Sequence, residues 1–154
     1  DISNLGQQFC LNLRGTNICN IKHLCNVDTL DISYNFNIYD ISALKNVRSL
    51  DISFCQNIEF TETMNNYELI AENSYLIDDD IYYLRNIKLL DIKNNYYITD
   101  ISPLKKTEQI DIRKCKNINK LPEIKVKIDV LRGHFYTHLI QLNNIYNEYH
   151  IHNH

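Results

Sequence analysis

The chain repeats an aliphatic pattern every 20 residues, and this repeat constrains the fold more than any other feature of the sequence. One series of aliphatic residues recurs at this spacing: Leu30, Leu50, Ile70, Leu90, Ile110 and Val130. A second series follows two positions later: Ile32, Ile52, Ile92 and Ile112. A unit this short cannot bury its own apolar face, so successive units have to stack on one another. The sequence therefore predicts a solenoid with one continuous core.

Each unit contains a strand signal followed by a tighter return. In Leu50-Asp51-Ile52 an aliphatic residue alternates with a polar one, which is typical of a short strand with one buried face. Aliphatic residues then recur every third position, which favours a 3₁₀-like or extended return: Ile38, Ile41, Leu44 and Val47. We expect a parallel sheet on one side of the stack and short irregular or 3₁₀ segments on the other.

A small polar or thiol side chain marks the point where the chain leaves each strand. Asn35 and Asn95 are expected to point inward, where their amides can satisfy backbone groups of neighbouring units. Cys55 and Cys115 occupy the same position as small buried residues with a weak donor.

These residues resemble the leucine-rich repeat family, whose core pattern is LxxLxLxx(N/C)xxL. Segments 40–44 (Asp-Ile-Ser-Ala-Leu) and 98–104 (Ile-Thr-Asp-Ile-Ser-Pro-Leu) are most similar to the internalin-type subclass, whose units are commonly a little longer. The resemblance covers about residues 1–130. It implies an α/β solenoid with a parallel sheet on its concave face, and a role in protein recognition.

The pattern divides the chain into a solenoid over residues 1–130 and a C-terminal segment over 131–154. The solenoid has about six repeats; the first one begins mid-repeat, which favours a fragment or a processed chain. The unit at 70–89 is degenerate, and we expect a bulge or register slip around 71–80 that turns Glu72 outward. The last segment predicts an amphipathic capping helix with one apolar stripe: Phe135, His138, Leu142, Ile145 and Tyr149.

Composition excludes several functional classes. The 154 residues are 44% hydrophobic and have a formal charge of -3, which fits one globular domain and gives no case for nucleic acid. No stretch is long and apolar enough to span a membrane. Three glycines provide no phosphate loop, and no nucleophile–base pair emerges from the spacing. We therefore expect neither catalysis nor a cofactor.

The use of cysteine and of AT-rich codons suggests an origin. Five cysteines without a CxxC pair favour a reducing compartment such as the cytoplasm, either of a host or of the cell of origin. The 23 Ile and 21 Asn residues indicate an AT-rich genome, such as that of a large DNA virus, a protist or a low-GC bacterium. In a virus or intracellular pathogen, the expected partner is a host protein.

The leading candidate site is the column of residues between the two aliphatics of each strand. The alternation places this column on the concave face: Asn12, Asp31, Asp51, Ala71, Asp91, Asp111 and Asp129. Stacked like charges repel, and a basic partner would relieve that repulsion. The alternative is that neighbouring Ser, Lys and Arg side chains pair with the carboxylates and leave a soluble surface.

An aromatic pair lies beside this column. Tyr34 and Phe54 hold matching positions in adjacent units. Exposed aromatic residues next to charges are typical of interaction hot spots, although the rings could instead lean over the strand edge and cover the core.

Two possible cation sites are weaker. Asp78, Asp79 and Asp80 lack the alternating ligands of a calcium loop, so we expect a solvated loop. His134 and His138 would share a helix face, but no acidic third ligand or HExxH pattern accompanies them. We therefore assign no metal site.

The sequence favours a recognition module that binds a protein partner through its concave face. The expected contacts are Asp31, Asp51, Asp91, Asp111, Tyr34 and Phe54. The first alternative is a structural spacer or adaptor segment of a longer protein. A third hypothesis is zinc-assisted catalysis through the C-terminal histidines. The oligomeric state is left open.

Overall fold

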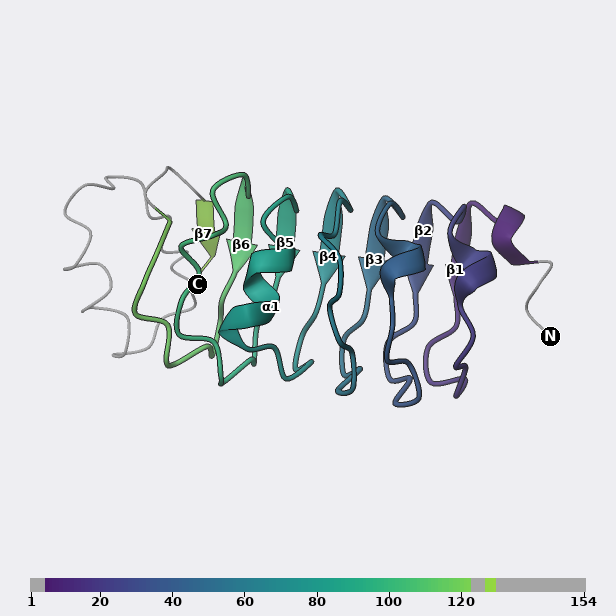
Figure 1. Ribbon diagram of the computed structural model, residues 1–154, viewed down its shortest axis with the longest axis horizontal. Coiled ribbons are helices and arrows are strands. Elements are labelled where there is room, and N and C mark those ends of the chain that lie inside the picture. The colour runs from purple at the N-terminus through teal and green to yellow at the C-terminus, as the bar shows by residue number, and fades with distance from the viewer. Residues whose placement is uncertain (1–4, 123–126, 130–154) are drawn as a thin grey trace, which may run out of the picture.

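The computed structural model describes residues 5–122 and 127–129 and contains one parallel sheet. Seven three-residue strands pair in chain order. Their bounds are β1 Cys10–Asn12, β2 Thr29–Asp31, β3 Ser49–Asp51, β4 Glu68–Ile70, β5 Leu89–Asp91, β6 Gln109–Asp111 and β7 Lys127–Asp129. Figure 1 shows them side by side along the molecule, one for each turn of the chain. The predicted parallel sheet is confirmed, and its regular spacing is compatible with a repeat solenoid.

Two rows of aliphatic side chains form the core behind the sheet. The middle residues of β2 to β6 point inward and are buried: Leu30, Leu50, Leu69, Leu90 and Ile110. The residues that follow β1 to β6 form the second buried row: Leu13, Ile32, Ile52, Ala71, Ile92 and Ile112. Because each unit adds one residue to each row, the units share one continuous apolar cluster.

Short helices lie on the side of the core opposite the sheet. The 3₁₀ helices are η1 Leu5–Gln7, η2 Lys22–Leu24 and η3 Ser42–Leu44. Leu24 and Leu44 are fully buried, which confirms the 3₁₀-like return predicted from the spacing of three. The α-helix α1 spans Asp78–Tyr83 and is drawn in front of the sheet in Figure 1. Its three aspartates were expected in a loop, but carboxylates are favourable in the first turn of a helix.

The predicted register of the degenerate unit is wrong by one residue. Leu69, rather than Ile70, pairs with Leu50 on one side and Leu90 on the other. The two spacings are 19 and 21 residues, so the following units return to the original period. Leu69 is buried, and Ile70 lies on the outer side of the sheet beside Asp51.

The same slip changes which residues fill the inward positions after β4. Ala71 is fully buried in the row of Ile52, and Ser74 donates to the carbonyl of Ile52 at 3.0 Å, as Cys55 does to Ile32 at 3.2 Å. Glu72 turns outward, as predicted. The slip itself begins at β4, just ahead of the predicted segment 71–80.

The last unit is also shorter than the period suggests. Ile128 pairs with Ile110 and Asp129 with Asp111, as predicted for a last strand at Ile128-Asp129-Val130, although the strict 20-residue series would place Val130 opposite Ile110. The rest of the C-terminal segment, including the predicted helix over 131–154 and its histidines, lies outside the described residues.

Buried amides connect successive turns, as predicted. The Asn35 amide donates to the carbonyls of Leu13 and Ile32, both at 2.8 Å. Asn95 repeats this arrangement three units later and also accepts from two backbone N–H groups. The thiol of Cys115 donates to the carbonyl of Ile92 at 3.0 Å, so the cysteines satisfy fewer groups at this position.

Candidate partner-binding face

The first and third residues of each strand form the open face, the side of the sheet that points away from the core. The third position holds aspartate in most strands: Asp31, Asp51, Asp91 and Asp111, with Asn12 and Asp129 in register at the ends. The structure thus brings the four predicted aspartates into one column. Ile70 interrupts this column, at the position where the sequence predicted Ala71.

The four predicted aspartates each accept a hydrogen bond from the backbone N–H two residues later. The acceptor–donor distances are 2.9 Å for Asp31, 2.8 Å for Asp51, 3.1 Å for Asp91 and 3.0 Å for Asp111. The side chain of Asn12 does the same at 3.0 Å. This bond stabilises the turn at the end of each strand. The column therefore has a structural role that is independent of any partner.

The charge of the column is balanced at one end only. Lys93 pairs with Asp91 at 2.8 Å and with Glu72 at 3.2 Å, and Arg113 donates to both carboxylate oxygens of Asp111. Among the residues that the structure describes, Asp31 and Asp51 form no salt bridge, although the Ser33 hydroxyl donates to Asp31 at 2.6 Å.

The environment of Asp51 disfavours its charged form. Burial, with a smaller contribution from the negative charge of Asp31, raises the pKa of Asp51 above its usual value. Hydrogen bonds from Ser53 and the positive charge of Arg14 oppose this shift without cancelling it. A cation placed over Asp31 and Asp51 would therefore stabilise the ionised pair.

The two predicted aromatic residues form a stack beside these aspartates. The rings of Tyr34 and Phe54 lie 4.3 Å apart between centroids, at an angle of 20°. The Arg14 guanidinium lies over the other side of the Tyr34 ring, 4.1 Å from its centroid. Both rings are partly exposed, so they neither project freely nor close over the core.

Tyr34 and Phe54 each lie three residues after the end of a strand, and the backbone at this position is left-handed in all six units from β1 to β6. The φ angles are positive at every equivalent residue from the first unit to the sixth: Gly15, Tyr34, Phe54, Asn73, Asn94 and Lys114. Asparagine and glycine adopt this conformation readily, whereas bulky residues rarely do. The aromatic pair is therefore placed where the backbone favours a smaller residue.

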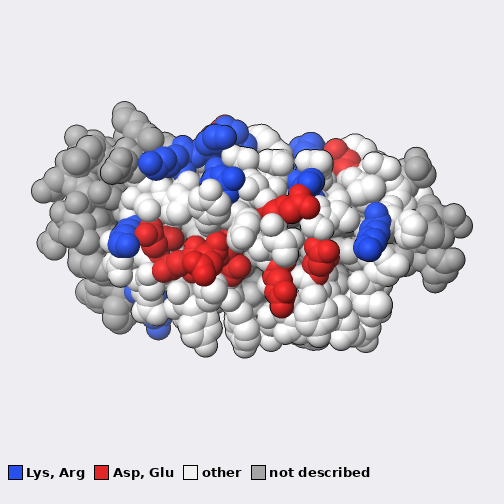
Figure 2. Space-filling model, in the orientation of Figure 1, with Lys and Arg blue, Asp and Glu red and all other residues white. Residues whose placement is uncertain are grey.

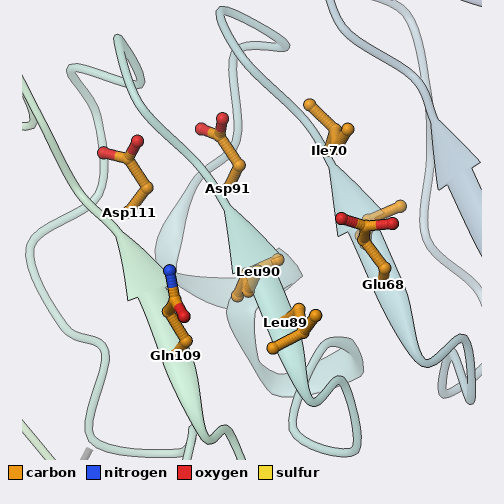
Figure 3. A pocket seen from close by; sticks show the side chains of 8 residues that line it. Glu68, Ile70, Leu89, Leu90, Asp91, Gln109 and Asp111 are labelled. Carbon is orange, nitrogen blue, oxygen red and sulfur yellow. The ribbon is translucent and has the colours of Figure 1, made fainter. Parts of the chain in front are cut away.

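A shallow hollow of about 180 Å³ lies on the open face over β4, β5 and β6. Figure 3 shows two rows of side chains around it: Ile70, Asp91 and Asp111 in one, and Glu68, Leu89 and Gln109 in the other. Sequence analysis missed this hollow because the predicted register turned Ile70 toward the core. With the correct register, Ile70 and Leu89 are the only aliphatic residues at the outer positions of the described strands.

The opposite, helix-bearing side has a different charge pattern. Figure 2 shows acidic side chains in a band across its middle and most of its basic side chains along one long edge. Asp78 accepts from the Thr99 hydroxyl and from the backbone N–H groups of Thr99 and Asp100. Burial acts to raise the pKa of Asp78, but these hydrogen bonds outweigh it, and the pKa is lowered. Asp78 is thus occupied in linking two turns.

Other features of the described chain add no further site. Within residues 5–122 and 127–129, no three His, Cys, Asp or Glu side chains converge in a way that could hold a metal ion. No helix in that part is long and apolar enough to cross a membrane. No family model matches the chain, and none of the curated proteins matches it.

Proposed function

We propose that the chain is a leucine-rich repeat module of the internalin type that binds a protein partner through the open face. The repeat pattern, the single short strand in each unit and the inward Asn and Cys residues support the family assignment. The proposed partner presents a basic surface. The proposed contacts are Asp31, Asp51, Asp91, Asp111, Tyr34 and Phe54, and the proposal includes no catalysis.

One observation supports this function most strongly. Asp31 and Asp51 lie on neighbouring strands without a salt bridge to the described residues, directly beside the stacked Tyr34 and Phe54. Unbalanced acids next to a partly exposed aromatic pair provide both charge complementarity and apolar area for a partner. Of the six predicted contacts, we expect the two aspartates without a salt bridge and the two aromatic residues to dominate binding. Asp91 and Asp111 should contribute less, because Lys93 and Arg113 already pair with them.

The structural role of the column supports a second candidate, a spacer within a longer polypeptide. The hydrogen bonds that Asp31, Asp51, Asp91 and Asp111 accept from the N–H two residues later explain the repeated Asp without a partner. A spacer has no need of an unbalanced acidic pair, so loss of charge at Asp51 separates the two candidates.

The test is capture of proteins from candidate host lysates by the immobilised chain and by its Asp51→Lys variant. The matched control is Glu59→Lys, which makes the same change of charge at an exposed residue whose backbone bridges Asp40, away from the open face. The proposal expects specific proteins that bind the parent and the control but not Asp51→Lys. Identical capture by all three chains would exclude the acidic face as the binding site.

A further inference from the structure

The hollow over β4–β6 results from the one-residue slip in the repeat. The slip turns Ile70 outward, in register with Asp51 on one side and Asp91 on the other. Leu89 stands on the neighbouring strand, in register with Glu68 and diagonally across from Ile70, as Figure 3 shows. Every other third position in the sheet is Asp or Asn, so an apolar floor occurs where the repeat would otherwise place a carboxylate.

The polar groups around this floor already have partners. Glu68 accepts from the Ser49 hydroxyl at 2.6 Å, Lys93 pairs with Asp91, and Arg113 with Asp111. A polar or charged group entering the hollow would compete with these partners. An apolar side chain would cover Ile70 and Leu89 and leave the surrounding bonds intact, so the hollow favours an apolar occupant.

Size and position restrict the occupant further. Sites for drug-sized ligands usually enclose about 300–1,000 Å³. A hollow of about 180 Å³ on an open sheet is better suited to a single side chain. The strand beside it contains Asp51, one of the two aspartates without a salt bridge, and paired strands lie about 4.8 Å apart. A basic group over Asp51 and an apolar group over Ile70 can therefore come from alternate positions of one extended partner segment.

We propose that the hollow is the specificity pocket of the open face and receives an aliphatic side chain, of leucine size, that lies two positions from a lysine or arginine in an extended partner segment. This inference rests on the proposed function and names the sequence chemistry that the face selects. The acidic pair provides attraction for any basic segment. The hollow selects, among basic segments, those that also present an aliphatic side chain on the same side.

The test uses two synthetic peptides, acetyl-Lys-Thr-Leu-Thr-Lys-amide and the same peptide with Ser in place of Leu. Both are titrated into the isotopically labelled chain at low salt, and binding is followed by NMR chemical shifts. Burying one leucine side chain corresponds to a gain of about tenfold or more in affinity. We therefore expect the Leu peptide to bind at least tenfold more tightly, with shifts at Ile70 and Leu89.

The matched variants copy residues that the chain already holds at equivalent positions. Ile70→Asn introduces the residue of Asn12, and Leu89→Ser that of Ser49, so both variants should keep the fold. Circular dichroism and thermal unfolding check this directly. In both variants the preference for Leu over Ser should fall to about one, and binding of the Ser peptide should be unchanged.

The outcomes separate this inference from the function on which it rests. If both peptides bind equally and Asp51→Asn abolishes binding, the pocket proposal is wrong but the acidic face is supported. A Leu preference that persists in Ile70→Asn would also overturn the pocket. If Asp51→Asn changes nothing but Ile70→Asn abolishes the preference, the pocket stands and the acidic face does not. Failure of both peptides to bind would overturn both.

Discussion

The amide of Asn95 donates to the carbonyl of Ala71, on the preceding turn of the chain, at 2.8 Å. The same amide donates to Ile92, and its oxygen accepts from the N–H groups of Ser74 and Leu76, each at 3.1 Å. One buried side chain thus satisfies backbone groups of two units. We expect Asn95→Ala to reduce the free energy of unfolding by about 3 kcal/mol, because several buried polar groups lose their partner.

Asn95→Cys is the matched control, since Cys55 and Cys115 hold the same position in other units. A thiol can still donate to one carbonyl, so the loss should be roughly half as large. Urea unfolding of the three chains gives both values. Equal stability of Asn95→Ala and the parent chain would contradict the role of this amide.

Neutralising Asp51 and Asp111 should have opposite effects on stability. The raised pKa of Asp51 means that its ionised form is disfavoured in the folded state, so the charge destabilises the fold once the pH exceeds the unfolded value. We expect Asp51→Asn to stabilise the chain slightly at pH 7, because the amide oxygen can still accept from Ser53, as Asn12 accepts from Arg14.

Asp111→Asn should instead destabilise the chain, by about 1 kcal/mol, because Arg113 loses its charged partner. Thermal unfolding at pH 7 distinguishes the two variants. A melting temperature lowered by the same amount in both would refute the difference in charge balance between the two ends of the column.

The buried thiols predict a loss of stability at alkaline pH. Burial raises the pKa of Cys55 to about 11 and that of Cys115 to about 12. The unfolded chain ionises first, at about pH 9, so stability is complete below that pH and declines as the pH rises toward 11 and 12. For Cys55 alone, the two-unit difference corresponds to about 3 kcal/mol. Urea midpoints measured from pH 8 to 11 check the trend. Cys55→Ala should weaken it, and replacement of both Cys55 and Cys115 by Ala should flatten it.

Alkylation gives an independent measurement of the same burial. At pH 8 iodoacetamide should label Cys10, Cys19 and Cys25, which are exposed, and leave Cys55 and Cys115 unmodified. Mass spectrometry should find labels on all five cysteines after unfolding in urea. Rapid labelling of Cys55 in the folded chain would show that its turn opens readily.

The aromatic stack is predicted to serve binding rather than stability. Phe54→Asn removes the stacked ring, but asparagine adopts the left-handed backbone readily, and Asn73 and Asn94 already occupy this position. We expect a change of less than about 1 kcal/mol in the free energy of unfolding, since the two effects oppose each other. Capture of the partner by the immobilised chain should fall at least tenfold. Unimpaired capture would leave the stack with a structural role alone.

Most of the architecture could be predicted because the aliphatic period is long and regular. The 20-residue spacing correctly placed strands at Leu30, Leu50, Leu90 and Ile110. It failed at Leu69-Ile70-Ala71, where three consecutive apolar residues allow either face to be buried. One signal could have corrected the register: Leu69-Ile70-Ala71 matches Leu50-Asp51-Ile52, and Ser74 then takes the place of Cys55.

The candidate site was predicted only as a column of side chains. Alternation along a strand shows that Asp51 and Asp91 share a face, but it cannot show which carboxylate pairs with a cation. That depends on the side-chain positions of Lys93 and Arg113, two residues beyond their aspartates. The hollow was missed for a different reason: it depends on the 19-residue spacing between β3 and β4, which the 20-residue period did not predict.

In the described sheet, each strand hydrogen-bonds only to the strands immediately before and after it in the chain. A tensile force on the two ends would therefore peel turns away from the outside while the interior stays assembled. Each released turn of 20 residues would lengthen the chain by about 70 Å. Under such a force the protein would lengthen in discrete steps, one turn at a time.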